Sequence, residues 1–259
     1  MIHLREAGVV VSDPDGDRTI LQPTSLEFRE HRIALIGANG SGKSTLARLL
    51  NGLVEPSTGS VQVAQGAAAA GGSPDGLRAE AETAAPAGQR WLDTRRDGAA
   101  VRRLVGFVFT NPAAQLVMPT VIEDVALSLR RLHRGKADRL AAARAALDRF
   151  GLGELADRSV HTLSGGQQQL LAIASVLATD PAILIADEPT TLLDLRNSRL
   201  VTETLLGLPQ QLIVATHDLE LAAGCERVLV VESGAVAFDT AAAGADPAEA
   251  VDWYRAAAR

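Results

Sequence analysis

The chain has 259 residues, 25 of them Lys or Arg and 31 Asp or Glu, which gives a net charge of -6. Hydrophobic residues make up 47%, enough for a packed core, and the acidic balance argues against a nucleic-acid-binding face, so no nucleic-acid partner is expected. The single cysteine excludes an internal disulfide, and the sequence has neither a membrane-length apolar run nor a signal-peptide pattern. These properties predict a globular protein of the cytoplasm.

The N-terminal stretch and the apolar runs that follow it predict an α/β fold. Residues 2–28 contain Asp-Pro and Asp-Gly steps, which favour turns, so we expect antiparallel strands joined by a hairpin. Short apolar runs then alternate with helical patterns; they lie at residues 32–37, 105–109, 183–186, 212–215 and 228–231. Such runs are typical of strands buried on both faces, and the alternation predicts a mostly parallel sheet.

Two stretches interrupt this alternation within what we expect to be one domain, residues 1–259. Residues 64–90 are dominated by Ala, Gly, Pro and Glu. Such a composition cannot offset the entropy cost of ordering, which predicts a disordered or weakly helical surface insertion. Residues 120–180 are rich in helical patterns, residues 137–150 among them, and predict an inserted helical subdomain.

A phosphate-binding loop is predicted where GANGSGKST matches G-x-x-x-x-G-K-[ST], after an apolar strand and before a helical run. The alternative is a simple Gly-rich turn, which would not need a strand before it and a helix after it. Backbone N–H groups of such a loop point at phosphate oxygens, and the helix N-terminus adds partial positive charge. We expect Lys43 to reach the β- and γ-phosphates and Ser44 to bind Mg²⁺. The predicted nucleotide-binding residues are Gly37, Ala38, Asn39, Gly40, Ser41, Gly42, Lys43, Ser44 and Thr45.

A second motif, AILIADEPT at residues 182–190, ends an apolar strand in Asp187 and Glu188. Ligands of such sheets bind beyond the carboxyl ends of the strands, so Asp187 is placed to hold Mg²⁺, usually through water. Glu188 could polarise the attacking water as a general base. Two solvated acids at a strand end are the alternative, which the upstream phosphate loop disfavours.

The segment LSGGQ begins a further helix and predicts a second anion site. Its serine can cap that helix, and two glycines let phosphate approach the helix N-terminus; a capped helix start alone is the simpler alternative. One nucleotide cannot easily need both sites within one subunit. The motif therefore predicts a head-to-tail pair with two-fold symmetry, in which each phosphate loop faces this segment of the other subunit. The predicted interface residues are Leu163, Ser164, Gly165, Gly166 and Gln167.

These three motifs and the later ATHD occur in the order found in ATPase subunits of ABC transporters, and the sequence resembles that family over nearly its whole length. The resemblance implies a P-loop NTPase core with an N-terminal antiparallel β subdomain, and Mg²⁺-dependent ATP hydrolysis coupled to transport. It matches Asp194 to a residue at the dimer interface. It also matches His217 to a histidine that contacts the γ-phosphate, which makes His217 a catalytic candidate beside Glu188.

Residues 107–127, FVFTNPAAQLVMPTVIEDVAL, look like the segment of energy-coupling-factor importers that contacts the membrane subunit. The resemblance implies that Gln115, Pro119, Thr120 and Glu123 make this contact. TTLLDLRN and the VFT variant resemble the biotin-importer ATPase. This implies vitamin import by an ATPase homodimer, or a pair with a related ATPase, at the cytoplasmic face of the membrane. The implied partners are an integral membrane coupling subunit and a substrate-binding membrane subunit.

Some features depart from the family or carry no motif. Thr110 stands where the family usually has a Gln that reaches Mg²⁺, and we predict that it contacts the metal shell with weaker coupling. The stretch VVVSDPDGD lacks the aromatic that often stacks on adenine, which predicts loose discrimination between ATP and GTP. Residues 130–139 are interpreted as a solvated loop rather than a lipid site, and Cys225 as a small semi-buried side chain. The tail around Trp253 and Tyr254 is expected to be a short helix.

Three other functions stay open at this point. The first is the ATPase of a cobalt, nickel or amino-acid importer. The second is a non-transport ATPase acting on DNA or ribosomes, which usually carries a coiled-coil insertion or two ATPase domains that this sequence lacks. The third is a nucleotide-gated binding module with little hydrolysis, against which Glu188 and His217 argue and in favour of which Thr110 stands.

Overall fold

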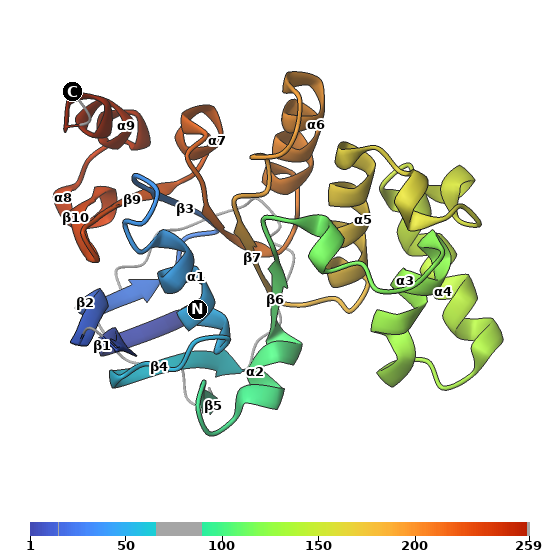
Figure 1. Cartoon of the computed structure of the whole chain (residues 1–259), viewed down its shortest axis with the longest axis horizontal. Coiled ribbons are helices and arrows are strands. Elements are labelled where there is room, and N and C mark those ends of the chain that lie inside the picture. Colours follow the sequence, from blue (N-terminus) through green and yellow to red (C-terminus); the bar gives the residue numbers. More distant parts are fainter. Residues whose placement is uncertain (15, 66–89, 258–259) are drawn as a thin grey trace, which may run out of the picture.

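Two sheets organise the molecule in the computed structural model, which describes residues 1–14, 16–65 and 90–257 (Figure 1). One is antiparallel with the order β2-β1-β4-β5: β1 (Ile2–Asp13), β2 (Gly16–Phe28), β4 (Thr58–Gln65) and β5 (Arg90–Asp93). The other has the order β10-β9-β3-β8-β7-β6: β3 (Arg32–Ile36), β6 (Val105–Val108), β7 (Ile183–Asp187), β8 (Gln211–Ala215), β9 (Arg227–Glu232) and β10 (Ala235–Asp239). Its strands are parallel except β10, which pairs antiparallel with β9.

The predicted fold class is confirmed. The five apolar runs are β3, β6, β7, β8 and β9, and the N-terminal hairpin is β1 and β2. One boundary was wrong: Ala64 and Gln65 belong to β4 and Arg90 belongs to β5, so both ends of the predicted insertion are strands. They are ordered because β4 and β5 pair with each other, Gln65 opposite Arg90. The rest of that prediction, residues 66–89, lies outside the described residues.

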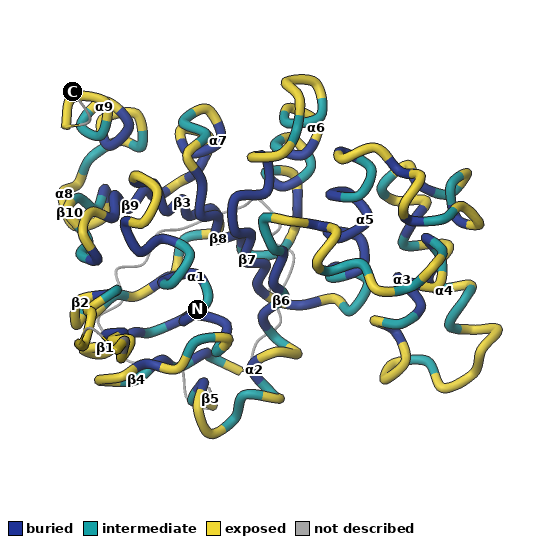
Figure 2. The backbone as a smooth tube through the Cα atoms, viewed as in Figure 1, coloured by how far each residue is buried: buried dark blue, intermediate teal, exposed yellow. Residues whose placement is uncertain are grey.

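The six-stranded sheet separates two hydrophobic cores, because successive side chains of a strand point to opposite faces. Along β3, Ile33 and Leu35 enter one core and Ala34 and Ile36 the other, and all four are fully buried. Figure 2 shows the central strands as dark blue tubes. Burying one large aliphatic side chain contributes about 1.5–3 kcal/mol, so these short strands are held mainly by packing.

Helices cover both faces of this sheet. The face toward the antiparallel sheet packs on α1 (Lys43–Asn51), while α2 (Gly98–Leu104) lies between β5 and β6 in the chain. Residues 121–177 contain helices and 3₁₀ turns, and they form the separate lobe at the right of Figure 1. Its elements are α3 (Val121–Ser128), η2 (Leu129–Arg131), α4 (Lys136–Arg149), η3 (Gly153–Leu155), η4 (Val160–Thr162) and α5 (Gly165–Leu177). The other elements are η1 (Pro112–Ala114), α6 (Leu195–Leu206), α7 (Leu219–Ala223), α8 (Thr240–Ala243) and α9 (Pro247–Ala257).

The C-terminal tail forms the expected helix, α9, and packs on its own chain against α7 and β9. Its Trp253 ring stacks on Phe238 of β10, with ring centroids 5.7 Å apart. Within the part of the chain that the structure describes, no helix has the length and apolar character needed to cross a membrane.

Cys225 is buried behind α7, and burial raises the pKa of its thiol from 9.0 to about 12. At pH 8 we therefore expect the native protein to react with iodoacetamide at least about a thousandfold more slowly than an unfolded thiol, because only the thiolate reacts. Mass spectrometry after timed labelling, with and without urea, measures the ratio. Fast labelling of the native chain would contradict this burial.

Candidate nucleotide site

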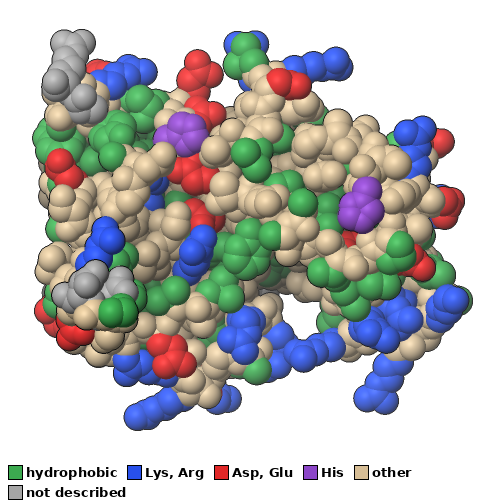
Figure 3. All heavy atoms as spheres, in the orientation of Figure 1, with side chains coloured by type: hydrophobic (Ala, Val, Ile, Leu, Met, Phe, Trp, Pro, Cys, Tyr) green, Lys and Arg blue, Asp and Glu red, His purple; other side chains and the backbone are tan. Residues whose placement is uncertain are grey.

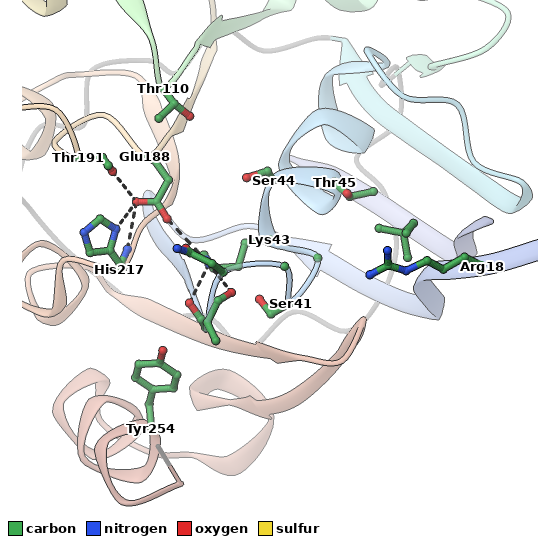
Figure 4. Close-up of a pocket in the computed structure, with 16 residues that line it drawn as sticks. Arg18, Ser41, Lys43, Ser44, Thr45, Thr110, Glu188, Thr191, His217 and Tyr254 are labelled. Carbon is green, nitrogen blue, oxygen red and sulfur yellow. Dashed lines mark hydrogen bonds and ion pairs between the residues drawn. The ribbon is translucent and has the colours of Figure 1, made fainter. Parts of the chain in front are cut away.

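A cavity of about 690 Å³ lies where β3, β6, β7 and β8 end. It is lined by the whole predicted phosphate loop, residues 37–45, and by Thr110, Glu188 and His217, which the sequence had singled out separately. Parallel strands bring these loops together because their carboxyl ends share one edge of the sheet. Figure 4 shows the side chains converging on this space.

The phosphate loop has a backbone that only glycine permits at its start. Gly37 has a φ of 151°, and a Cβ there would lie 2.1 Å from the carbonyl oxygen of Val231. The Lys43 ammonium donates to the carbonyl oxygens of Gly37 at 2.7 Å and Ala38 at 3.0 Å. Burial lowers the pKa of Lys43, opposed by the negative charges of Glu188 and Asp187. Within the described residues this buried cation has one distant carboxylate partner, Glu188 Oε1 at 3.8 Å, and is well suited to an added anion.

Asp187 is fully buried, and both of its carboxylate oxygens have partners. Ser44 Oγ donates to Oδ1 at 2.7 Å, and Arg48 Nη2 donates to Oδ2 at 3.0 Å. A hydroxyl next to one carboxylate oxygen suits Mg²⁺, which prefers oxygen ligands and takes its others from water and substrate phosphates. Among the described residues no group of three acidic, His or Cys side chains could hold a metal.

Arg48 was missed by sequence reasoning, although it follows Ser44 by one helical turn and so lies on the same face of α1. Replacing Arg48 by Met leaves a buried carboxylate without its cation. We expect the free energy of unfolding to fall by about 1–2 kcal/mol, at the low end for a charged hydrogen bond because the Arg48 side chain is 43% exposed. Adding Mg²⁺ and ATP should shrink the difference, since a cation held beside Asp187 would replace part of the positive charge that the variant has lost. Urea melts measure it, with Arg48→Lys as the control; equal stability of the Met variant would refute the role.

Glu188 is held by a strained backbone, by one hydrogen bond from its backbone N–H and by three contacts to its carboxylate. Its φ is 52°, unusual for a residue with a side chain, and its N–H donates to Ala215 O at 2.8 Å. Oε2 accepts from Thr191 Oγ1 at 3.0 Å and from the His217 backbone N–H at 3.3 Å, and lies 2.6 Å from His217 Nδ1. The other oxygen faces the cavity beside Lys43. This arrangement fixes a carboxylate where it can accept a proton from a water molecule.

Thr110 follows β6 and lines the cavity at the level of Glu188 (Figure 4). The threonine side chain is shorter than that of glutamine, so its hydroxyl reaches less far than a glutamine amide would. We expect Thr110→Gln to raise the ATPase rate about fivefold, the equivalent of one net hydrogen bond of about 1 kcal/mol, and to lower the Mg²⁺ concentration at half-maximal rate. Steady-state hydrolysis over a Mg²⁺ series tests this. An unchanged rate and Mg²⁺ dependence would show that position 110 does not reach the metal shell.

The cavity is also lined by residues that were not predicted to belong to the site. Arg18 and Ile20 come from β2 and Tyr254 from α9, at opposite ends of the chain. Figure 4 shows Arg18 and Tyr254 on different sides of the phosphate loop. The stretch VVVSDPDGD of the N-terminal hairpin lacks an aromatic, as noted, but Tyr254 of α9 lines the cavity. Thr191 could have been found, because it follows Glu188 by three residues.

The LSGGQ segment begins α5 as a capped helix, apart from the cavity. Ser164 Oγ accepts from the Gln167 backbone N–H at 3.3 Å, and Gln167 Oε1 accepts from the Ser164 N–H at 3.0 Å. None of residues 163–167 is among the described residues that line the cavity. Asp194 caps α6 by accepting from Asn197 N–H at 2.8 Å and is exposed. The two predicted anion sites are therefore separate within one chain.

The residues predicted to contact a membrane subunit do not share one environment. The Gln115 amide is engaged inside the chain: Oε1 accepts from Phe109 N–H at 3.2 Å, and Nε2 donates to Ala172 O at 3.4 Å. Pro119 and Glu123 are exposed, and Glu123 accepts from Thr120 Oγ1 at 2.6 Å at the start of α3.

Asp124 lies within the segment 107–127 and was not among the residues predicted to make this contact. It is buried, it accepts from the backbone N–H groups of Val117 at 2.8 Å and Met118 at 3.1 Å, and it accepts from Ser175 Oγ at 3.2 Å. These bonds hold the exposed loop before α3 against α5. The sequence does contain a signal for Asp124, since it is a carboxylate among apolar residues near the start of a helix.

Comparison with known proteins identifies the class. Residues 21–191 match the ABC transporter family, and the chain belongs to that family. The biotin transport ATP-binding protein BioM of Rhizobium etli is 44% identical over 254 residues, 98% of this chain and 97% of that protein. The dimeric ATP-binding cassette MJ0796, in a post-hydrolysis state bound to ADP and Pi, has a TM-score of 0.73 at 26% identity and covers 92% of this chain and 97% of that one. The structure of cbiO1 from Clostridium perfringens, part of the ABC transporter complex cbiONQ, has a TM-score of 0.71 at 26% identity and covers 97% and 90%.

The family places the site in a known class of chemistry. The chain is an ATP-binding and ATP-hydrolysing subunit of an ABC transporter, and such cassettes dimerise and work with membrane subunits. The resemblance to ATPase subunits of ABC transporters is confirmed, and so is the prediction that the chain is an ATPase.

Proposed function

We propose that this chain powers an energy-coupling-factor importer of a vitamin, biotin. The observation that carries the proposal is the 44% identity with a biotin transport ATP-binding protein across nearly the full length of both chains. The segment at residues 107–127, which begins in β6, supports it, because that segment has the pattern of this importer group.

In the proposed reaction, each residue of the cavity has a role that its contacts support. Lys43 turns from the carbonyl oxygens of the phosphate loop to the β- and γ-phosphates, while the loop N–H groups hold the other phosphate oxygens. Ser44 and Asp187 are suited to hold Mg²⁺, which would neutralise charge developing on the phosphates. Glu188 takes a proton from the attacking water, and His217 holds Glu188 and reaches the γ-phosphate.

The proposed assembly is a homodimer, or a pair with a related ATPase. The separation of residues 163–167 from the cavity supports it, because a second copy can bring this capped helix start to the γ-phosphate. Asp194 lies exposed beside the same surface and is proposed to join the interface. Pro119, Thr120 and Glu123 are proposed to contact the integral coupling subunit, which holds the ATPase peripherally at the cytoplasmic face of the membrane. The internal bonds of Gln115 favour a bracing role for that residue instead.

The test is reconstitution. The chain is co-expressed with candidate membrane subunits, and uptake of labelled biotin into vesicles loaded with ATP is compared with uptake of Co²⁺ and Ni²⁺. We expect biotin uptake that stops in Glu188→Gln. Uptake of metal alone would reject biotin and leave a transporter ATPase. The likeness to cbiO1 makes another importer of the group the second candidate.

A further inference from the structure

Basic side chains that the nucleotide site does not use gather along one edge of the molecule. Residues 93–103 and 130–139 together carry nine Lys or Arg and three Asp or Glu, in a chain whose net charge is -6. Figure 3 shows blue side chains along its lower edge, over α2 and over the connection from α3 to α4, with a hollow between the two groups. We call the eight exposed ones the basic edge: Arg95, Arg96, Arg102, Arg103, Arg130, Arg131, Arg134 and Lys136.

The basic edge carries charge that nearby acids do not compensate. None of its eight cationic groups forms an ion pair or side-chain hydrogen bond with another residue in the described ranges. The acids beside α2 are used elsewhere: Asp93 Oδ1 accepts from the backbone N–H groups of Arg95 at 2.9 Å and Arg96 at 3.2 Å. Asp97 accepts from the Asp93 N–H at 3.1 Å and faces Arg90 at 3.9 Å. Eight free cations thus project a positive field from an acidic protein.

An apolar side chain stands among these cations. Leu132 directly follows Arg131 at the end of η2 and is 59% exposed. Arg139 of α4 ties this turn to the helix, because its Nη1 donates to the carbonyl oxygen of His133 at 3.2 Å. Cations around an exposed leucine can meet both the headgroups and the outer acyl boundary of a bilayer, which is the pattern of interfacial membrane contact.

We propose that the basic edge binds the anionic headgroups of a phospholipid bilayer and holds this ATPase against the membrane on both sides of the hollow. The proposal rests on the proposed function as a membrane-transporter subunit. Clusters of four to eight Lys and Arg are typical of anionic-lipid surfaces. A protein partner would need fixed acids opposite eight exposed side chains that are spread over two lobes, whereas a lipid surface supplies mobile anions across that whole span. Taken alone, residues 130–139 are interpreted as a solvated loop. Together with the cations at α2 they form the surface that we propose for lipid.

Vesicle binding tests this with the purified full chain. Sedimentation is compared for vesicles of phosphatidylcholine alone and with about one third phosphatidylglycerol, at low and high salt. One variant changes Arg95, Arg96, Arg102 and Arg103 to Gln, and another changes Arg130, Arg131, Arg134 and Lys136 to Gln. The control removes four exposed cations elsewhere, with Arg5, Arg196, Arg199 and Arg255 changed to Gln.

We expect the wild type to bind the anionic vesicles alone, each basic-edge variant to bind at least about tenfold more weakly, and the control to bind nearly as the wild type does. High salt should release the protein. The proposal fails if the wild type shows no preference for anionic vesicles or if the control loses as much binding. It also fails if the variants keep vesicle binding but no longer co-purify with membrane subunits, which would assign the edge to a protein contact.

ATP hydrolysis and ATP affinity of the same samples separate this proposal from the proposed function. The basic-edge variants should keep the hydrolysis and ATP affinity of the wild type, since no residue of the edge lines the nucleotide cavity. Wild-type biotin transport without vesicle preference would overturn only the lipid contact. Vesicle preference without biotin transport would overturn only the proposed function.

Discussion

The variant Glu188→Gln is expected to bind ATP and to lose about 10²- to 10⁴-fold of its hydrolysis rate, the range for removal of a general base. The amide keeps the size of the side chain but cannot take a proton from water. It also removes the negative charge 3.8 Å from the Lys43 ammonium, so ATP affinity should hold or increase. Single-turnover hydrolysis and equilibrium binding of ATP measure the two effects separately.

Glu220→Gln is the matched control, because this exposed acid follows His217 by three residues and undergoes the same change of charge. It should hydrolyse ATP at the wild-type rate. If Glu188→Gln kept even a tenth of the wild-type rate, the base would have to be another group, and His217 is the nearest candidate. Thr191→Val then tests whether orientation of Glu188 matters, since it removes one of the bonds to Oε2.

The second large effect is expected for Lys43→Met, which should weaken ATP binding by about 2–5 kcal/mol, or roughly 30-fold to several thousandfold. The ammonium is buried, and its hydrogen bonds to described residues go to two loop carbonyl oxygens, so it is available for phosphate. Methionine has a similar length and removes the cost of burying a charge. The variant should therefore fold at least as stably as the wild type, which thermal unfolding without nucleotide verifies.

The chain offers one other lysine, Lys136, which is exposed on the helical lobe. Lys136→Met is the control for charge, and its affinity for ATP should stay within twofold of the wild type. Inorganic triphosphate extends the test, since Lys43 is proposed to act on phosphates and not on the base. A Lys43→Met variant that loses ATP but keeps triphosphate would contradict that role.

Local patterns predicted the central sheet well. A run such as residues 32–36 has no polar side chain after Arg32, and only a strand between two packed layers buries every residue of such a run. The pairing of β4 with β5 was not predicted, because Thr58–Gln65 has a mixed composition and its partner lies beyond residues 66–89. A long connection hides such a pair from any local pattern.

Local patterns also predicted the parts of the site that carry motifs, and missed the parts that support them. Arg48 has no motif of its own, and its importance comes from Asp187, a buried carboxylate at the end of β7, far away in sequence. Arg18 and Tyr254 line the cavity only because β2 and α9 reach it from the two ends of the chain. The two halves of the basic edge likewise belong to different lobes.

The sequence alone determined the class of this protein, because phosphate binding needs a particular order of glycines, lysine and hydroxyl within one strand–loop–helix unit. Consecutive residues specify such short-range geometry, so it can be recognised without the rest of the fold. Only the tertiary structure decided which side chains hold Asp187 and Glu188, that the LSGGQ segment stands apart from the cavity of its own chain, and that two basic segments share one edge. Those relations depend on how distant strands and helices pack, and packing is settled by the whole core rather than by any one segment.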